Sequence, residues 1–306
     1  MSLGQPKQQS QPKQLQTKDG VSVASAVVRQ NRRRRTGTEW AALVVTVLVA
    51  VVMGAPLLLV LLNAVKSPQD FADHGPLGLP TGIYLEGIKT FWEAVDFPRK
   101  VWNSVLISSL VAALGVLISV LNAYALGIGR IKGRMWVLVA FLLATIVPQE
   151  ALLYPLYIMF KNIGLYDTVW AVVIVFVVIH GAFGTYLMAS VFSAFPRELL
   201  EAAALDGANR RQILWRVVVP VCRPTLAVLA VFFFIWTWNE FLIPLSFLVS
   251  ADNQTVQVGI ATLQGERIMN VTTISASALL GIAPTLLFFL VFQRTLTRGL
   301  TAGAIK

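Results

Sequence analysis

Ionisable side chains are rare in the apolar runs of this sequence, and those that occur there are the first candidates for chemistry. Two carboxylates, Glu150 and Glu240, and one imidazole, His180, fall inside such runs. A charge in the middle of a membrane helix costs about 2.5–3.5 kcal/mol on insertion scales, so each residue is expected to have a specific role. Together with Tyr154 and Asn239 they could line a polar pathway. Alternatively they make hydrogen bonds between helices, which is the favoured interpretation for Glu150 and His180.

The other reactive residues do not form a catalytic or metal-binding pattern. Cys222 is the one cysteine of the chain and permits no internal disulfide, and the two histidines, His74 and His180, are too far apart in sequence to indicate a metal site. The phosphate-binding pattern GxxxxGK followed by Ser or Thr is absent, so any ATP that this protein uses must bind to another subunit. The sequence therefore predicts a chain that is not an enzyme and that binds no metal or cofactor itself.

The composition is that of a membrane protein. Of the 306 residues, 56% are hydrophobic and 13% are charged, and the mean hydropathy is +0.71. Soluble domains are about 45–50% apolar and about 25% charged. A soluble globular enzyme and a disordered chain are both excluded, which leaves a multi-span membrane protein.

Six apolar runs have about 20 residues or more, which is enough to cross ~30 Å of hydrocarbon as helices. These runs are 40–62, 103–128, 135–160, 168–193, 225–249 and 273–293. The predicted fold class is therefore an all-α polytopic membrane protein, with six transmembrane helices in one domain over residues 40–306.

Basic residues are concentrated on one side of these six spans. Of the 25 Lys and Arg residues, 19 fall in residues 1–39, the 129–134 turn, the 194–224 loop and the segment after residue 293, which all lie on the same side. Cytoplasmic loops carry the excess of Lys and Arg in membrane proteins. Both termini and the 194–224 loop are therefore predicted to be cytoplasmic.

Residues 1–39 are predicted to be a disordered basic tail, because they are rich in Gln and Lys and contain no apolar segment. The lack of an apolar core also argues against a cleavable signal peptide. Arg32–Arg35 directly precede an apolar run, so they are interpreted as a topology anchor and not as a nucleic-acid site.

The 194–224 loop predicts two short helices joined by a glycine turn. Pro196 suits the first turn of a helix, and Gly207 supplies the left-handed residue that commonly ends one. A second helix is predicted from about Asn209 to Val218, ending at Pro220 because proline interrupts helices.

The first of these two helices offers a surface for another protein. Ala202 and Ala203 are small enough to let a partner approach closely, and Glu201 and Asp206 offer charge to a basic partner. The alternative is an elbow that only lies on the membrane surface.

The segment Glu201–Gly207, followed after nine residues by Val217–Pro220, resembles the EAA loop of binding-protein-dependent ABC importers. The family pattern is Glu-Ala-Ala, three residues, Gly, nine residues and Ile-x-Leu-Pro, and the two valines that replace Ile and Leu are conservative changes. Other segments resemble the carbohydrate branch of these permeases, and the last of them is similar to the end of the smaller six-span subunit of maltose-type importers. These segments are Asn103-Ser104, Tyr154–Tyr157, Gly164-Leu165, Trp238–Phe241 and Gly299–Lys306.

This resemblance implies a type I ABC importer permease fold in the plasma (inner) membrane of a prokaryote. A second homologous permease subunit would complete the translocation pathway, and two ATPase subunits would hold ATP and Mg. An extracytoplasmic solute-binding protein would deliver a sugar or sugar-like solute. In the coupling loop, Glu201 would be the charged contact to an ATPase, Ala202 and Ala203 the close-packing surface and Gly207 the turn, with Asp206, Val217 and Pro220 completing the motif.

The resemblance also gives the polar residues in the spans a role, because Gln149, Tyr154 and Asn239 would add hydrogen-bonding groups for sugar hydroxyls. It does not identify the solute, since disaccharides, oligosaccharides, polyols and glycerol phosphates all fit. The alternative function is a stand-alone proton-coupled secondary transporter that uses Glu150, His180 and Glu240 as a relay. That alternative leaves the helix–glycine–helix loop unexplained.

Overall fold

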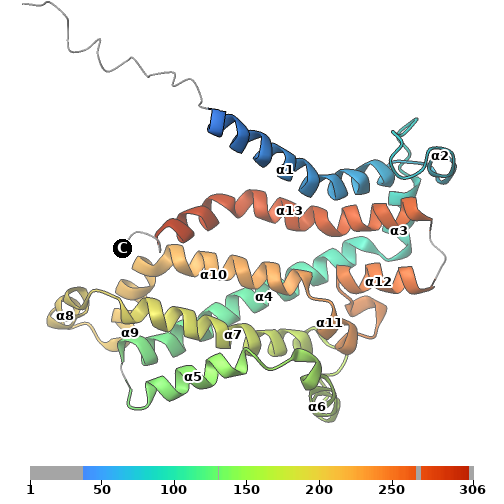
Figure 1. Cartoon of the computed structure of the whole chain (residues 1–306). Helices are drawn as coiled ribbons and strands as arrows, with labels where there is room; N and C mark the ends of the chain where they lie inside the picture. The colour runs from blue at the N-terminus through green and yellow to red at the C-terminus, as the bar shows by residue number, and fades with distance from the viewer. Residues whose placement is uncertain (1–36, 130, 267–269, 303–306) are drawn as a thin grey trace, which may run out of the picture. The chain divides into compact units, whose positions relative to one another are not determined.

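The computed structural model describes residues 37–129, 131–266 and 270–302, and these residues are helical without any β-strand (Figure 1). The helices in chain order are α1 (Gly37–Ala64), α2 (Pro68–His74), α3 (Glu86–Ala94), α4 (Phe97–Ala123), α5 (Arg134–Ala144), α6 (Gln149–Asn162), α7 (Val169–Ser193), α8 (Arg197–Leu205), α9 (Arg210–Ile213), α10 (Val219–Asn239), α11 (Leu242–Phe247), α12 (Val256–Glu266) and α13 (Val271–Ala302). A π-helical turn follows α4 (η2, Tyr124–Ile128) and another follows α9 (η3, Leu214–Val218), and a 3-10 turn (η4, Ala251–Asn253) precedes α12. Two compact units divide the chain inside α1, one up to Ala55 and one from Pro56 onward.

Five helical segments are long and apolar enough to cross a membrane. They are Gly37–Ala64, Phe97–Ile128, Val169–Ser193, Arg210–Asn239 and Val271–Gln293. They coincide with five of the predicted spans, although their ends differ, and α5 with α6 passes the same test only as a bent pair. The predicted tail 1–39 lies outside the described residues except for Gly37–Glu39, which begin α1.

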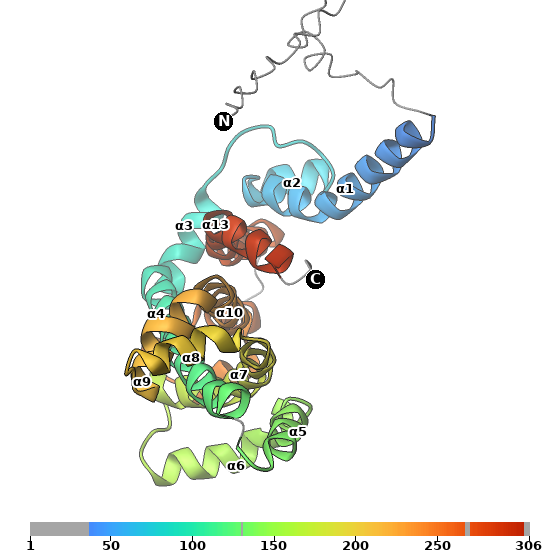
Figure 2. The same ribbon diagram turned by 90° about the vertical axis from the view of Figure 1, so that its left-hand side faces the viewer.

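The predicted span 135–160 is wrong as a single helix. The axes of α5 and α6 are bent by 93° relative to each other, and Figure 2 shows the two helices running in different directions. Pro148 explains the break, because proline disfavours helical backbone at the residue before it and has no N–H for a helix that arrives from upstream. At the end of α5, Thr145 Oγ1 donates to Leu142 O over 2.6 Å.

The predicted span 225–249 is wrong at both ends. One continuous helix runs from Arg210 through η3 to Asn239. Glu240 then takes an extended backbone, with φ −73° and ψ 135°. Pro244 explains this stop, because in a continued helix its ring would clash with the carbonyl of Glu240. The rest of the predicted span forms the separate short helix α11.

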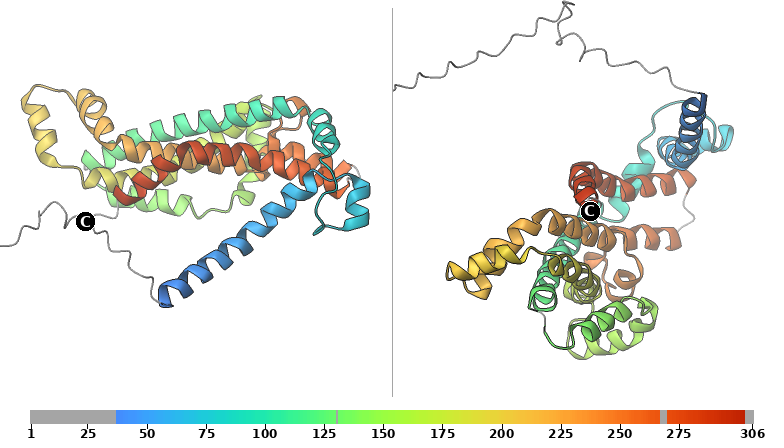
Figure 3. Two further views of the ribbon diagram at one scale, coloured as in Figure 1. Left: turned by 90° about the horizontal axis from the view of Figure 1, so that it is seen from above. Right: turned by 60° about the vertical axis from the view of Figure 1, so that its left-hand side comes forward.

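The main bundle consists of α4, α7, α10 and α13, which lie side by side (Figures 1 and 3). Glycine allows the closest approach between them. A Cβ atom at Gly184 on α7 would lie 2.2 Å from Ser119 Oγ on α4 and 2.8 Å from the Phe233 ring on α10. Close backbone approach at small residues supplies much of the packing energy between membrane helices, because lipid offers no hydrophobic drive for their association. Close packing at Gly184 therefore holds α4, α7 and α10 together.

Each end of the bundle has its own apolar core. At the end that carries α8, called here the loop end, α4, α7, η3 and α10 form a core that includes Phe192, Leu214 and Phe233. At the opposite end, called the far end, α4, α6, α7 and α11 bury side chains that include Phe160 and Phe247. The short helices at both ends are thus packed onto the bundle.

Asp167 ties the α6–α7 connection to the segment before α12. Its backbone is left-handed, with φ 60°, a conformation that Asp adopts more easily than most residues. Its carboxylate accepts hydrogen bonds from the Ser250 N–H (3.0 Å) and the Ser250 hydroxyl, and Asn253 Nδ2 donates to its backbone carbonyl (2.7 Å). Burial acts to raise the pKa of the Asp167 carboxyl, but the hydrogen bonds from Ser250 and Asn253 outweigh burial and lower the pKa below its ordinary value.

Replacing Asp167 with Ala is expected to lower the Tm of the purified chain by about 3 °C near neutral pH, the shift that a loss of ~1 kcal/mol gives in a chain of this size. The folded-state pKa is lowered, so the contribution of Asp167 is complete above the unfolded-state pKa of about 3.9 and is lost as the pH falls through the folded-state pKa. The difference in Tm between wild type and variant should therefore be largest near neutral pH and shrink as the pH falls through the folded-state pKa.

Asp167→Asn is the matched control for this prediction. It retains the preference for a left-handed backbone and a side-chain acceptor but lacks the charge, so its Tm should lie between the other two. Equal melting temperatures for all three proteins near neutral pH would contradict the proposed tie.

Candidate functional site

A helical hairpin of α8, Gly207 and α9 stands at the loop end of the bundle (Figure 3). α8 begins directly after Pro196, as the sequence predicts. Gly207 has a φ of +80°, and the preceding turn is closed by a hydrogen bond from the Asp206 N–H to Ala202 O over 3.0 Å. The predicted left-handed glycine turn is confirmed.

The second helix begins where the sequence predicts but does not end there. Asn209 starts it with a capping box, in which its side chain accepts from the Gln212 N–H (3.0 Å) and the Gln212 side chain accepts from the Asn209 N–H (2.8 Å). The predicted stop at Pro220 is wrong. The Val219 N–H donates to Leu214 O, five residues back, and this widened turn accommodates a proline that has no N–H to offer.

The predicted coupling residues differ in exposure, and two of them, Val217 and Pro220, lie after the hairpin on the helix that follows α9. Ala203 and Val217 are half-buried and pack against the loop-end core. Leu205, at the end of α8, is 89% exposed although it is apolar. The remaining residues of the predicted set are exposed: Glu201, Ala202, Asp206, Gly207 and Pro220. The hairpin therefore packs against its own bundle while acidic and small residues stay exposed on it. Asp206 and Gly207 line the same hollow as Ala203 and Val217.

One unbroken helix connects this hairpin with a cavity that is lined by polar residues of the predicted spans. The segment Arg210–Asn239 has 30 residues, which corresponds to a length of about 45 Å. Near its start, the Tyr124 hydroxyl donates to Arg210 O over 3.0 Å. At its other end, Trp236 and Asn239 line a cavity.

This cavity has a volume of about 400 Å³ and lies between the α5–α6 break, α7 and the end of α10. Its polar lining comprises Thr145, Gln149, His180, Trp236, Asn239 and Glu240. The sequence analysis singled out several of these residues, whereas Thr145 was missed because only the helix break turns it toward the others.

His180 is 8% exposed and is enclosed by aromatic rings. Its ring stacks between Phe176 and Phe233, with centroid distances of 5.4 and 5.3 Å, and meets the Trp236 ring at 5.6 Å. Its Nε2 atom is buried and has no hydrogen-bond partner among the described residues, and the same holds for Gln149 Oε1.

The structure brings together three of the five predicted pathway residues. His180, Asn239 and Glu240 line the cavity, whereas Glu150 and Tyr154 do not. Both of these are exposed on α6, and Tyr154 is 73% exposed. The bend between α5 and α6 carries them away from α7 and α10, so a relay through Glu150, His180 and Glu240 is not assembled in this cavity.

The fold agrees with comparisons with known proteins. A family model described as "Binding-protein-dependent transport system inner membrane component" matches residues 115–299, which include the hairpin and the cavity. The chain belongs to this family. It is accordingly a permease subunit of an ABC transporter, in which ATP hydrolysis belongs to a separate subunit.

Several curated relatives of this permease are transport proteins. It is 35% identical over 67% of its length to the sulfoquinovosyl glycerol transport system permease protein SmoH of Agrobacterium fabrum, covering 72% of that protein. It is 31% identical over 80% of its length to the diacetylchitobiose uptake system permease protein DasC of Streptomyces coelicolor, covering 88% of it. It is 30% identical over 89% of its length to the trehalose transport system permease protein SugB of Mycobacterium tuberculosis, covering 98% of it.

A solved structure supports the fold of the permease. It is the crystal structure of a bacterial ABC transporter involved in the import of the acidic polysaccharide alginate. A chain of that transporter matches with a TM-score of 0.70 at 21% identity, over 85% of the permease and 98% of that chain. The similarity shows a shared fold.

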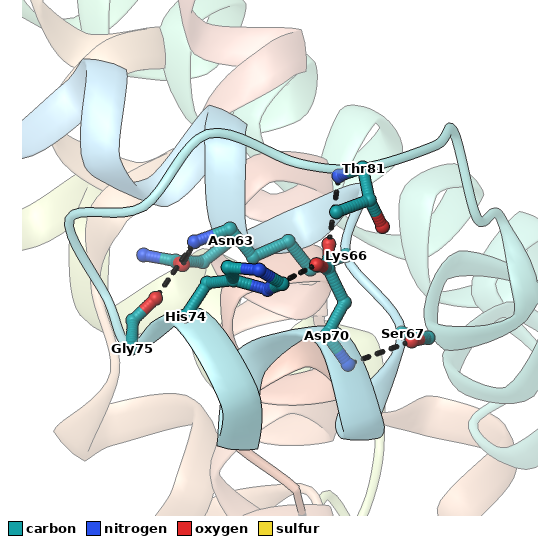
Figure 4. A network of polar contacts seen from close by, with 7 residues as sticks. All are labelled: Asn63, Lys66, Ser67, Asp70, His74, Gly75 and Thr81. Carbon is teal, nitrogen blue, oxygen red and sulfur yellow. Dashed lines mark hydrogen bonds and ion pairs between the residues drawn. The ribbon is translucent and has the colours of Figure 1, made fainter.

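A polar network after α1 of the permease escaped the sequence analysis. Lys66 is 1% exposed, and its Nζ donates to Asn63 Oδ1 (3.0 Å) and Gly75 O (2.8 Å), as Figure 4 shows. Asp70 accepts from the Thr81 N–H (3.1 Å) and pairs with His74 Nδ1 (3.0 Å). The signal that could have revealed it is Ser67-Pro68-x-Asp70, which begins α2, with Ser67 as its N-cap.

This network fixes the connection from α1 through α2 to residue 81. Burial acts to raise the pKa of the Asp70 carboxyl, but the hydrogen bonds from Thr81 and His74 lower it below the ordinary value. The carboxylate is therefore ionised at neutral pH and holds the end of this connection to α2.

Replacing Gly207 with Val is expected to reduce ATP hydrolysis coupled to solute in the assembled transporter at least about tenfold. The reason is the backbone alone, since a Cβ atom at Gly207 would meet nothing within 4 Å. A left-handed backbone costs an ordinary L-residue about 1–2 kcal/mol and is worse for a β-branched one. Stimulation of ATP hydrolysis by solute and binding protein is the measurement.

Gly207→Asn is the matched control, because Asn enters the left-handed region more readily than other non-glycine residues. It should retain most of the stimulation. Equal stimulation in the Val variant and wild type would mean that the geometry of this turn does not affect coupling.

Proposed function

We propose that this chain is one of two homologous permease subunits of an ABC importer for sugars or sugar-like solutes. The observation that carries the proposal is the α8–Gly207–α9 hairpin, joined without a break to the helix that lines the intramembrane cavity. The names of the relatives, which include permeases for diacetylchitobiose, lactose and trehalose, support the solute class.

In this proposal the hairpin is the coupling loop. Glu201 on its exposed face is the charged contact to an ATPase subunit, and Ala202 allows close approach. Ala203 and Val217 hold the hairpin to the permease, so a push on the loop moves the bundle with it. The helix Arg210–Asn239 transmits the displacement, because a helix with intact hydrogen bonds moves as a body.

The proposed topology has six crossings, with α5 and α6 counted as one bent crossing, and both termini in the cytoplasm. It is supported by the six apolar segments and by the concentration of Lys and Arg on the side of the 194–224 loop. The membrane is then the inner membrane of a prokaryote, with the coupling loop facing the cytoplasmic ATPases. Residues 1–39 have no role in the proposal.

The partners follow from the same proposed function. A second permease subunit completes the pathway, two ATPase subunits carry ATP and Mg, and an extracytoplasmic protein delivers the solute. His180, Asn239 and Glu240 are proposed to line the pathway in this chain. Glu150 and Tyr154 are proposed to face other parts of the assembly from α6. A proton-coupled mechanism finds no support, because Glu150 does not share the cavity of the other two ionisable residues.

Replacing Glu201 with Lys is expected to remove the ATPase subunits from a pull-down of the tagged chain in mild detergent, while the second permease is still recovered. The physical reason is the reversal of charge at the proposed contact. The measurement is the stoichiometry of each subunit in the purified complex, together with ATP-dependent uptake in proteoliposomes.

Glu93→Lys is the matched control, because Glu93 is also an exposed helical glutamate but lies on α3, away from the hairpin. This variant should retain the ATPase. Full recovery of ATPase subunits with Glu201→Lys would remove the assigned role from this residue. Recovery of the wild-type chain alone under all gentle conditions would contradict the proposed assembly.

A further inference from the structure

The connection between α2 and α3 exposes large apolar side chains. Leu77, Leu79 and Ile83 are each at least 75% exposed. Residues 75–85, called here the apolar loop, contain no charged side chain. Several exposed apolar side chains in one short segment, unlike a single one, mark a site of interaction with a protein or a membrane. The apolar loop is therefore a surface that requires a partner.

Buried polar side chains hold the backbone of the apolar loop in place (Figure 4). The Nζ atom of Lys66, which is buried, donates to Gly75 O over 2.8 Å. The carboxylate of Asp70, which is also buried, accepts from the Thr81 N–H over 3.1 Å. These bonds satisfy polar groups of the loop backbone while its apolar side chains stay exposed. The exposure of these side chains is therefore a fixed feature of the connection.

Two further hydrogen bonds tie the apolar loop to the end of α1. Asn63 Nδ2, in the last turn of that helix, donates to Pro76 O over 3.2 Å. The Tyr84 N–H donates to Val65 O, directly after the helix, over 2.8 Å. Because α1 is one of the helices that are long and apolar enough to cross a membrane, a loop held at its last turn lies at a membrane surface.

The apolar surface of α1 continues into the apolar loop. Leu57, Leu58 and Leu61 in the second half of α1 are exposed and apolar, as side chains that face lipid are. Tyr84 in the loop is exposed as well, and the amphipathic ring of tyrosine is enriched at the interface between membrane and water. Irregular backbone does not occur in the hydrocarbon region. The loop backbone is therefore expected at headgroup level, with only its side chains reaching deeper.

A soluble protein that docks and leaves is the competing occupant of this surface. Reversible protein interfaces are about as apolar as the rest of a protein surface, at about 56–58% of their area, and they have a polar rim. The apolar loop offers no charged group over eleven consecutive residues. Its composition therefore favours lipid over a soluble partner.

We propose that the apolar loop is an interfacial anchor, which inserts Leu77, Leu79 and Ile83 into the bilayer around the permease and keeps Tyr84 at headgroup level. The partner is the lipid surface itself, selected by apolar contact and not by headgroup charge. With the proposed topology the anchor lies in the outer leaflet. The inference goes beyond the proposed function, because it depends on α1 as a membrane span and not on the solute.

The test uses the full importer and, separately, the tagged chain alone, both reconstituted in vesicles of phosphatidylethanolamine and phosphatidylglycerol. Cys222→Ala removes the one cysteine of the chain, and Leu79→Cys or Ile83→Cys then carries a nitroxide spin label. Relaxation of the label by dissolved oxygen and by a water-soluble nickel chelate gives its depth in the bilayer. Asp73→Cys is the matched control, because Asp73 is also exposed but is a charged residue of α2.

The labels at positions 79 and 83 are expected about 5–10 Å below the lipid phosphates, the depth to which interfacial segments bury their apolar face. The control label should lie in water. Both depths should be equal in the full importer and in the chain alone. They should also persist in vesicles of phosphatidylcholine, because the apolar loop has no charge to respond to anionic lipid.

Three results would overturn the inference and identify the true surroundings of the loop. Labels that the nickel chelate reaches as readily as the control would place the loop in water. Labels screened from both reagents in the full importer, but not in the chain alone, would mean that another subunit covers the loop. Labels that lose access to the chelate only after addition of the solute-binding protein would identify a docking site for that protein. Failure to isolate the importer would contradict the proposed assembly and leave the measurement on the chain alone decisive.

Discussion

The hydrogen-bonded backbone of one helix, Arg210–Asn239, is the element on which the two sites of this permease depend. Its first turns belong to the helical hairpin and its last turn to the cavity, so neither site can shift along the helix axis independently of the other. Pro220, in its first half, would ordinarily interrupt it. The π-helical turn η3 accommodates this proline, so the helix continues across the bundle. The rigid connection therefore depends on this local change of helical pitch.

Around this helix, the backbone is continuous between the hairpin and the cavity and is interrupted at the cavity itself. The backbone breaks before Gln149 and after Asn239, and the cavity lies where these two breaks meet α7. Polar side chains at a broken helix in a membrane are tolerated where they line a cavity and do not face lipid. The breaks therefore give the site its polar character as well as its space.

Much of this arrangement could be predicted from sequence, and the errors have physical causes. Apolar runs predicted the spans because a bilayer demands about 20 apolar residues in a row, and Gly207 predicted its own left-handed turn. A hydropathy profile contains no information on bends between helices, so the sequence predicted α5 and α6 as one span. Pro220 and Pro244 read alike in sequence, yet only Pro244 ends a helix, because a widened turn before Pro220 accommodates it. Lys66 was missed since one of its two partners is the backbone carbonyl of Gly75, which has no sequence signal.

The helix breaks also divide the molecule mechanically. Within the described residues, helices are interrupted at 145–148, 240–241 and 248–255 toward the far end, and at 194–196 and 206–209 at the loop end. Rotation about a few backbone torsions at such joints leaves every helical hydrogen bond in place. The long helices between these connections, with Arg210–Asn239 among them, are therefore the stiff parts of the permease, and a change of its shape has to come from the connections.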